Sequence, residues 1–383
     1  MRDAKEHGRR RRVISQCLSE TNVRAFEPTI SSQIDNFIKC LAPSAGMEWS
    51  AVMNMSKWCD HHLFDLMTKI IFSASYNALQ EDEYKEIMEC LAESNVRMSA
   101  LWNAPVLKSF RLDKYLFPKA IIARNVFIRF VGQMVNERSK KADCHDVFSR
   151  LWAHANLATE EALSPSQIVA ESTTLIVAGS DTTSTALAAT LFYLSTNSKA
   201  YQQVINEVRS TFGLKEEIKA GPKLSSCLYL RASIHEAMRL SPSAGGPLWR
   251  EVKKDGIVID GIFVPEGCDV GMGIYSIQHQ ASHFPDPFSY KPERWLKDIS
   301  KSDIFNSAYM AFSTGPRGCV GKSLALLELS LTMANILWAL DFESDFADIS
   351  GGGFGCHPSE FFMRDHITAV HNGPFLKFRE RQY

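Results

Sequence analysis

The sequence has almost no net charge, no closely paired cysteines, and neither internal repeats nor a long low-complexity linker. Its formal net charge is −1 at pH 7, which argues against a nucleic-acid partner held by bulk electrostatics. Nine cysteines are scattered along the chain without a C-x-x-C pair, and their number is odd. The chain therefore fits a reducing compartment better than a disulfide scaffold.

Patterns that direct a chain into a membrane are also lacking. The most apolar stretch, Ile168–Leu194, contains Glu171 and Asp181 together with several Ser and Thr residues. This predicts a helix buried in protein rather than in lipid. The polar N-terminus has a basic run, Arg9–Arg12, with no apolar stretch behind it. We therefore expect no transmembrane segment and no signal peptide.

What the chain does have is enough apolar content for a large core. Of its 383 residues, 45% are hydrophobic and 22% are charged, which excludes disorder. One helix start is well marked, with Ser164 as N-cap, Pro165 at the first helical position and Gln167 three residues after the cap. Helical spacing of apolar residues predicts helices at Thr29–Leu41, Val52–Phe72, Asp82–Ala100, Ala120–Lys140, Pro165–Ser195 and Ser226–Leu240.

After Pro242 the pattern changes from helices to short strands. Two β-branched runs within Ile257–Pro265 flank an Asp-Gly turn, which predicts a hairpin. Further strands are expected at Ile367–Val370 and Phe375–Phe378. The expected fold is mainly α with a small β portion, in a single domain of residues 1–383.

The most specific pattern is the ten-residue string Phe312–Gly321. Its cysteine, Cys319, lies among three glycines and close to Arg317, and an apolar helix is expected at Leu324–Leu340. Glycine lets the backbone approach a bound group closely. Backbone N–H groups, a helix N-terminus and positive charge all stabilise a thiolate. Such a thiolate is a metal ligand or a nucleophile; the alternative is a buried, inert cysteine.

Two further patterns involve charged residues in predicted helices. The hexapeptide Ala178–Thr183 interrupts an apolar helix with glycine, hydroxyl groups and one acid, which suits proton delivery. Its alternative is a local helix break or polar packing against a neighbour. Glu236 and Arg239 lie three residues apart on one helix face with apolar flanks, so a buried pair is expected, with Arg294 as an additional partner.

Together these strings resemble the cytochrome P450 family of haem-thiolate monooxygenases. The cysteine loop matches all five fixed positions of the family's Phe-x-x-Gly-x-Arg-x-Cys-x-Gly pattern, namely Phe312, Gly315, Arg317, Cys319 and Gly321. The resemblance implies the cytochrome P450 fold, with Cys319 as the axial ligand of haem iron. A thiolate ligand favours O–O cleavage.

The same resemblance assigns roles to the other two patterns. The hexapeptide is similar to the oxygen-binding stretch of the family's long distal helix. This implies that Asp181 and Thr182 help supply protons, and that Ala178 and Gly179 leave room for dioxygen and substrate. The charged residues resemble the family's Glu-x-x-Arg and Pro-Glu-Arg-Phe motifs, which have a structural role. Trp295 replaces the commoner Phe of the second motif.

Haem carries two carboxylates, for which Arg is the best-suited partner. Arg317, Arg250 and Arg11 match family positions that bind these groups, Arg11 through the string His7-x-x-x-Arg11. The alternative for the run Arg9–Arg12 is a solvated basic face or a membrane-surface patch.

The resemblance covers essentially the whole chain but starts at the family's third helix. A membrane anchor, two helices and most of a β-sheet precede that helix in eukaryotic members. We therefore expect one wall of the substrate pocket to be absent, sheet edges to be unpaired, and haem binding or folding to be poor if Met1 is the true start. The endoplasmic reticulum membrane, on its cytosolic face, is the location expected for the family; without an anchor the alternative is the cytoplasm.

The resemblance implies an NADPH-driven monooxygenase that inserts one oxygen atom of O2 into an apolar small molecule. Electrons would come from a separate NADPH–cytochrome P450 reductase, because no flavin domain or dinucleotide fingerprint follows Cys319. The motifs are similar to those of filamentous-fungal members of secondary metabolism. One alternative is a truncated haem-binding remnant with little or no turnover. The other is a rearranging or peroxide-using relative, and the presence of Asp181 and Thr182 argues against it. A cysteine hydrolase would need His357 or His366 near Cys319.

Overall fold

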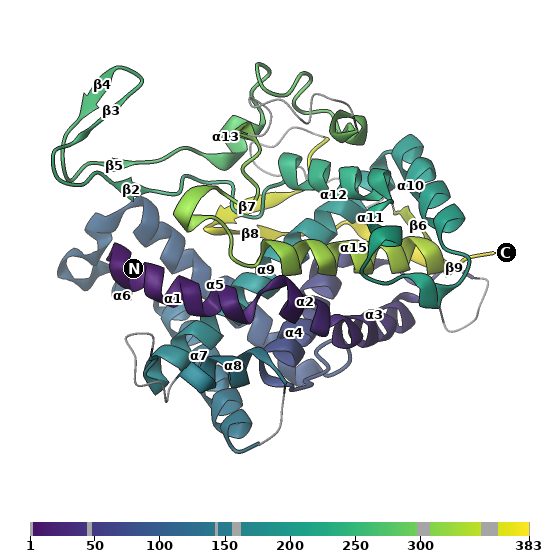
Figure 1. Ribbon diagram of the computed structural model, residues 1–383, viewed down its shortest axis with the longest axis horizontal. Coiled ribbons are helices and arrows are strands. Elements are labelled where there is room, and N and C mark those ends of the chain that lie inside the picture. Colours follow the sequence, from purple (N-terminus) through teal and green to yellow (C-terminus); the bar gives the residue numbers. More distant parts are fainter. Residues whose placement is uncertain are drawn as a thin grey trace.

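A computed structural model describes residues 3–43, 48–141, 145–154, 162–296, 307–345 and 359–382 (Figure 1). Its helices are α1 (Ala4–Cys17), α2 (Glu20–Ala25), α3 (Glu27–Leu41), α4 (Met55–Phe72), α5 (Asp82–Asn103), α6 (Leu112–Leu116), α7 (Pro118–Ser139), α8 (Val147–Ala153), α9 (Pro165–Thr196), α10 (Ser198–Thr211), α11 (Pro222–Ser225), α12 (Leu228–Leu240), α13 (Ile274–Gln278) and α15 (Lys322–Ala339). Strands are short and few by comparison, so the expected fold class, mainly α with a small β portion, is confirmed.

The longest helix, α9, forms the centre of the molecule. Its start is the predicted capping box, in which the Ser164 side chain accepts from the Gln167 N–H while the Gln167 side chain accepts from the Ser164 N–H. By length and composition, α9 is the one helix of the described ranges that could cross a membrane, but 61% of its most apolar window is buried inside the protein. It packs along α4 and also contacts α12 and α15, as a core helix does.

The strands form one three-stranded sheet and three pairs. Strands β1 (Met53–Asn54), β9 (Phe375–Glu380) and β6 (Leu340–Ser344) make an antiparallel sheet in the order β1-β9-β6. The pairs are β2 (Arg250–Glu251) with β5 (Asp269–Val270), β3 (Ile257–Ile259) with β4 (Ile262–Val264), and β7 (Met363–His366) with β8 (Thr368–His371).

The predicted hairpin is confirmed as β3–β4. Its turn residues Asp260 and Gly261 have φ of 48° and 78°, the left-handed values that a two-residue hairpin turn requires. The hairpin projects away from the helical body (Figure 1), and Val258, Ile262 and Phe263 are each more than 60% exposed. Within the ranges given above, β3 and β4 pair only with each other.

Among the described residues, the main hydrophobic core extends from Val13 in α1 to Phe378 in β9, and a small second cluster contains Phe284 and Ala308. Six predicted helices correspond to α3, α4, α5, α7, α9 and α12, with ends that differ by a few residues. The seventh, expected at Leu324–Leu340, is α15. Helix α10 had no counterpart among the predictions. Its buried residues Ala200, Val204 and Val208 recur every four positions, so the signal was present in the sequence.

Candidate active site

The cysteine loop is a tight turn that ends at the start of α15. The backbone N–H of Cys319 donates to the carbonyl of Phe312 at 2.8 Å, and that of Gly318 donates to Gly315 at 3.0 Å. Gly315 has a φ of 69°, which a residue with a Cβ adopts only at a cost. These contacts hold Cys319 just before the first turn of α15, which begins at Lys322.

The environment of the Cys319 thiol contains opposing influences. Cys319 is an exposed residue, but desolvation by the protein atoms around its thiol still raises its pKa, and this effect outweighs the backbone N–H groups of Gly321 and Lys322 and the charges of Arg11 and Lys322, all of which lower it. The net pKa therefore lies above the usual value for cysteine. A coordinated metal ion removes a thiol proton outright, whereas titration alone would leave this thiol protonated at neutral pH.

Cys319 faces the polar interruption of α9 across a cavity of about 100 Å³. Ala178, Gly179 and Thr182 line the α9 side, and Glu328 lines the α15 side. Most of the remaining lining is apolar: Leu18, Met67, Ile70, Ile71, Val147, Leu175, Val320, Leu324 and Ala325. Two of the patterns singled out from the sequence, about 140 positions apart, therefore meet in one apolar site.

The acid and the hydroxyl of the predicted pair diverge in space. The Thr182 hydroxyl donates to the Ala178 carbonyl at 2.7 Å, and Thr182 borders the cavity. Asp181 does not border it; its carboxyl group accepts from Thr368 on β8, and burial raises its pKa to about 6. Thr182 therefore faces the cavity, whereas the Asp181 side chain contacts β8.

Gly179 has a packing role that the sequence did not reveal. A Cβ at this position would lie 2.3 Å from the Met67 methyl carbon on α4. The missing side chain thus lets α4 pack closely against α9 beside the cavity. Met67 is flexible, so a larger residue at position 179 would displace Met67 rather than the backbone.

Of the three predicted arginines, Arg317 lies within the cysteine loop, and Arg11 and Arg250 lie close to it. Arg11 donates through Nη1 to the Gly318 carbonyl at 2.6 Å. Burial lowers the pKa of His7, and the charges of Arg317 and Arg11 lower it further, which places both guanidinium groups near this ring. Arg317 and Arg250 line one cleft of about 700 Å³. Together they form a basic edge suited to carboxylates.

The rest of the N-terminal basic run is partly committed to ion pairs. Arg9 and Arg10 both contact Glu6, at 2.8 and 2.6 Å. Arg10 also contacts Glu171 at 3.0 Å, which ties α1 to α9. Arg9 and Arg10 are therefore part of neither a solvated basic face nor a membrane-surface patch, because both form ion pairs within the protein.

These residues fit a haem group. In the described part of the chain, no cluster of three or more His, Cys, Asp or Glu side chains could hold a metal ion. A metal at Cys319 would therefore need its other ligands from a non-protein group, as a porphyrin provides. The apolar walls suit the porphyrin face, and the guanidinium groups of Arg11 on the loop and of Arg250 and Arg317 in the neighbouring cleft suit its two carboxylates.

A buried charged cluster joins α12 to the segment that follows α13. Glu236 and Arg239 are fully buried and pair at 2.9 Å, and Arg294 pairs with the same carboxylate at 2.9 Å. Two further donors were not anticipated: the Lys291 N–H at 3.1 Å and the Trp295 indole N–H at 2.9 Å. With all its lone pairs occupied, the Glu236 carboxylate can stay charged in the interior.

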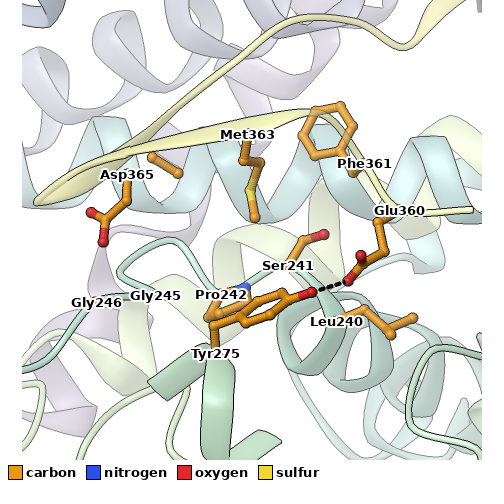
Figure 2. Close-up of a pocket in the computed structure, with 11 residues that line it drawn as sticks. Leu240, Ser241, Pro242, Gly245, Gly246, Tyr275, Glu360, Phe361, Met363 and Asp365 are labelled. Carbon is orange, nitrogen blue, oxygen red and sulfur yellow. Dashed lines mark hydrogen bonds between the residues drawn. The ribbon is translucent and has the colours of Figure 1, made fainter. Parts of the chain in front are cut away.

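A second pocket, of about 270 Å³, is lined by Leu240, Tyr275 and Glu360 among others (Figure 2). Figure 2 shows the Tyr275 hydroxyl on the Glu360 carboxylate, a bond of 2.8 Å, with Asp365 on the opposite side of the pocket. Ser243 connects the two sites, since its hydroxyl donates to the Thr182 carbonyl and its own carbonyl accepts from Ala369. No sequence motif pointed to Tyr275 or Glu360.

Within the described residues, the cysteine-hydrolase alternative has no histidine base at Cys319. No histidine lines the cavity at Cys319 among the residues that the structure describes. His366 lies on β7 and does not border that cavity. His357 lies outside the described residues. A nucleophilic cysteine needs a base within hydrogen-bond distance, so the described geometry favours a metal ligand.

Comparison with known proteins identifies related sequences along the whole chain. The family model described as Cytochrome P450 matches residues 1–363. Cytochrome P450 monooxygenase poxM of Penicillium oxalicum is 44% identical over 385 residues, covering 99% of this chain and 73% of the relative. Cytochrome P450 monooxygenase apf8 of Gibberella fujikuroi is 42% identical over 368 residues, covering 94% of this chain and 100% of the relative.

Among solved structures, the crystal structure of a cytochrome P450 haem domain matches the fold with a TM-score of 0.77. The match covers 97% of this chain and 77% of that chain at 17% sequence identity. It therefore supports the fold and leaves the substrate open.

Proposed function

This chain belongs to the cytochrome P450 family and is a monooxygenase of that family, and we propose that it inserts one oxygen atom of O2 into an apolar small molecule. The observation that carries the proposal is the position of Cys319, which faces Gly179 and Thr182 of α9 across a shared apolar cavity. A haem-thiolate site needs a cysteine sulfur on one side and a polar interruption of a helix on the other. Cys319 and the segment with Gly179 and Thr182 provide these two parts.

In this proposal, Cys319 provides the axial thiolate of haem. Arg11, Arg250 and Arg317 bind the haem carboxylates, while Phe312, Gly315 and Gly321 shape the loop around the sulfur. When bound, haem supplies the redox chemistry, and a thiolate ligand favours O–O cleavage. The protein contributes orientation, the exclusion of water and the supply of protons.

The proton-supplying residues in this proposal are Thr182 and Asp181. The Thr182 hydroxyl borders the cavity and is oriented by its bond to the Ala178 carbonyl. Asp181 lies next to it in sequence, and its pKa of about 6 lets it hold and release a proton near neutral pH. Ala178 and Gly179 carry little or no side chain and so leave room for dioxygen and substrate.

The site and the relatives support a substrate class, an electron-transfer partner and a location for this proposal. The largely apolar lining favours an apolar substrate, and the relatives named above come from filamentous fungi, which supports a role in fungal secondary metabolism. Electrons come from NADPH through a separate cytochrome P450 reductase. Residues 1–383 act as one domain around one main core, at the cytosolic face of the endoplasmic reticulum membrane.

The test is the carbon monoxide difference spectrum of the reduced, haem-loaded protein. A thiolate-type Soret band is expected for the parent, and its loss is expected for Cys319→Ser. Cys227→Ser is the control, because Cys227 is buried at the start of α12 and does not line the cavity. An imidazole-type band or no band in the parent would favour the haem-binding remnant instead. A Cys319→Ser variant that binds haem and oxygenates as the parent does would refute the assignment.

A further inference from the structure

A second acid and a histidine lie close to Asp181 but do not border the Cys319 cavity. They are Asp60 of α4 and His371 of β8. The His371 Nε2 atom lies 3.6 Å from Asp60 Oδ1, and the Ser184 hydroxyl on α9 donates to the same Oδ1 at 2.6 Å. The side chain of His371 is 3% exposed and that of Asp60 is 30% exposed. His371 is thus buried in the interior, whereas its neighbour Asp60 is in contact with solvent.

Hydrogen bonds determine which nitrogen of His371 carries the proton. The Ser56 hydroxyl donates to the Gly373 carbonyl at 2.6 Å, so its single proton is used. The Ser56 oxygen therefore accepts from His371 Nδ1, which lies 2.6 Å away. His371 is consequently the Nδ1–H tautomer, and Nε2 is left as a free acceptor that faces Asp60.

Asp181 completes this group from the other side. Its Oδ2 atom is buried without a hydrogen-bond partner. The other contacts of its carboxyl group involve Thr368, which in turn accepts from Asn95 of α5 at 3.0 Å. Asp181 interacts electrostatically with both Asp60 and His371. An unpartnered buried carboxylate oxygen is costly unless it carries or receives a proton.

We propose that Asp60 and His371 form a proton-supply pair that reloads Asp181 from solvent. The proposal rests on the proposed function, because it gives Asp181 its source of protons. Asp60 and His371 act through Asp181 and do not border the cavity, so they are positioning residues. Their role is to keep the acid protonated between turnovers.

The proton transfer balances without any change in oxidation state. The O–H bond of the Asp60 carboxyl group breaks and an N–H bond forms at His371 Nε2, which leaves a carboxylate and an imidazolium. In the proposed sequence, the imidazolium ring then moves toward the unpartnered Asp181 Oδ2, the N–H bond at Nε2 breaks as an O–H bond forms at that oxygen, and the ring returns to its neutral form. Asp60 takes a new proton from water, which its partly exposed side chain can reach.

The protonation states of the three groups suit this sequence. Although 30% of the Asp60 side chain is exposed, desolvation by the surrounding protein raises the pKa of its carboxyl group to about 7, while the hydrogen bond from Ser184 lowers it. Burial lowers the pKa of His371 to about 4, and the charge of Asp181 raises it. Both acids therefore exchange protons near neutral pH, and the ring between them rests in its neutral form and is protonated only in transit.

The first experiment needs neither haem turnover nor substrate. The carboxyl carbons of Asp181 and Asp60 are titrated by NMR in protein labelled with 13C-aspartate. Asp60→Asn retains the size of the side chain and removes the second charge, so the pKa of Asp181 is expected to shift downward. His371→Asn retains a donor to Ser56 and removes Nε2, and the pKa of Asp181 is expected to shift upward. An Asp181 titration that is the same in all three proteins overturns the proposal.

The second experiment measures hydrogen peroxide released per NADPH consumed, with purified reductase and no added substrate. Asp60→Asn and His371→Asn are each expected to raise this ratio several-fold and to alter its pH profile, whereas Asp60→Glu restores it. Asp65→Asn is the control, because Asp65 lies on the same helix but accepts from the Ala78 and Leu79 amides. It is expected to lower stability and leave the ratio unchanged.

The outcomes separate this proposal from the proposed function. If the carbon monoxide spectrum shows no thiolate band but the Asp181 titration responds to Asp60→Asn, the function is wrong and the coupled acid pair stands. If the band is present while Asp60→Asn leaves the peroxide ratio at the parent value, the proton-supply role is wrong and the function stands.

Discussion

The indole N–H of Trp295 donates to Glu236 Oε2 at 2.9 Å, in the buried cluster where Arg239 and Arg294 also contact this carboxylate. The Pro-Glu-Arg-Phe motif that this segment resembles has Phe at the position of Trp295. The substitution therefore adds a hydrogen bond that a Phe ring cannot make. The indole ring also stacks on His235 with a centroid distance of 5.2 Å.

Trp295→Phe is expected to destabilise the protein by about 1–3 kcal/mol, the usual range for a hydrogen bond to a charged group. The Phe ring retains most of the packing, so the loss reports mainly on the missing donor. Urea unfolding of parent and variant measures it. Glu236→Gln is the comparison, and it should cost more because two arginines lose their counter-charge. A Trp295→Phe variant as stable as the parent would show that the indole bond contributes nothing.

Thr182→Ala is expected to lower product formed per NADPH by about tenfold or more, with the lost reductant recovered as peroxide, because a positioned proton donor is removed. Thr190→Ala is a matched control on the same helix. The Thr190 hydroxyl donates to the Ala186 carbonyl at 2.7 Å, as the Thr182 hydroxyl does to Ala178, but Thr190 does not border the cavity. Equal yields per NADPH in parent and Thr182→Ala would contradict the proton-supply role.

Arg11→Gln is expected to release haem about tenfold faster, a change equivalent to roughly 1.4 kcal/mol. Gln still offers an N–H to the Gly318 carbonyl but lacks the charge that a haem carboxylate needs. Transfer of haem to an excess of apomyoglobin measures the rate. Arg24→Gln serves as the control, since Arg24 is an exposed residue paired with Glu20 away from the site. Identical release rates would remove Arg11 from the haem site.

Glu328 predicts a pH dependence of stability for the protein without haem. Burial raises its pKa to about 8, and one carboxylate oxygen has no partner. The folded state therefore holds a proton that the unfolded chain, with a pKa near 4.5, has released, so the free energy of unfolding falls as the pH rises from about 4.5 to 8. The slope from this one group approaches about 1.4 kcal/mol per pH unit.

Glu328→Gln cannot titrate and should remove this part of the slope. Urea unfolding of both proteins between pH 6.5 and 8 is the informative comparison, because the difference between them isolates Glu328 from the other buried acids and histidines. Parallel stability curves for parent and variant would show that Glu328 is ionised in the folded protein.

Local patterns predicted much of the fold correctly. The start of α9 follows from Ser164, Pro165 and Gln167, because capping depends on residues within one turn. The hairpin β3–β4 follows from Asp260-Gly261, because that turn requires positive φ at both residues. Strands β6 and β7 had no prediction, since their partners β9 and β8 decide whether a short mixed segment pairs at all.

The site was predictable only where a motif spans consecutive residues. The cysteine loop and the α9 hexapeptide were found this way, and the structure brings both to one cavity. Asp60 and His371 belong to no motif, and their approach to Asp181 depends on how α4 and β8 pack on α9. The same holds for Tyr275 and Glu360 in the second pocket (Figure 2).

By itself, the sequence determined the chemistry that this protein carries: one cysteine in a glycine-rich loop, an acid beside a hydroxyl in an apolar helix, and three arginines. These are properties of residue type and short spacing, and no partner is needed to recognise them. Only the tertiary structure decided that Thr182 borders the cavity while Asp181 turns toward Asp60 and His371. Neighbouring residues on a helix point about 100° apart, so packing on each face selects what each side chain meets.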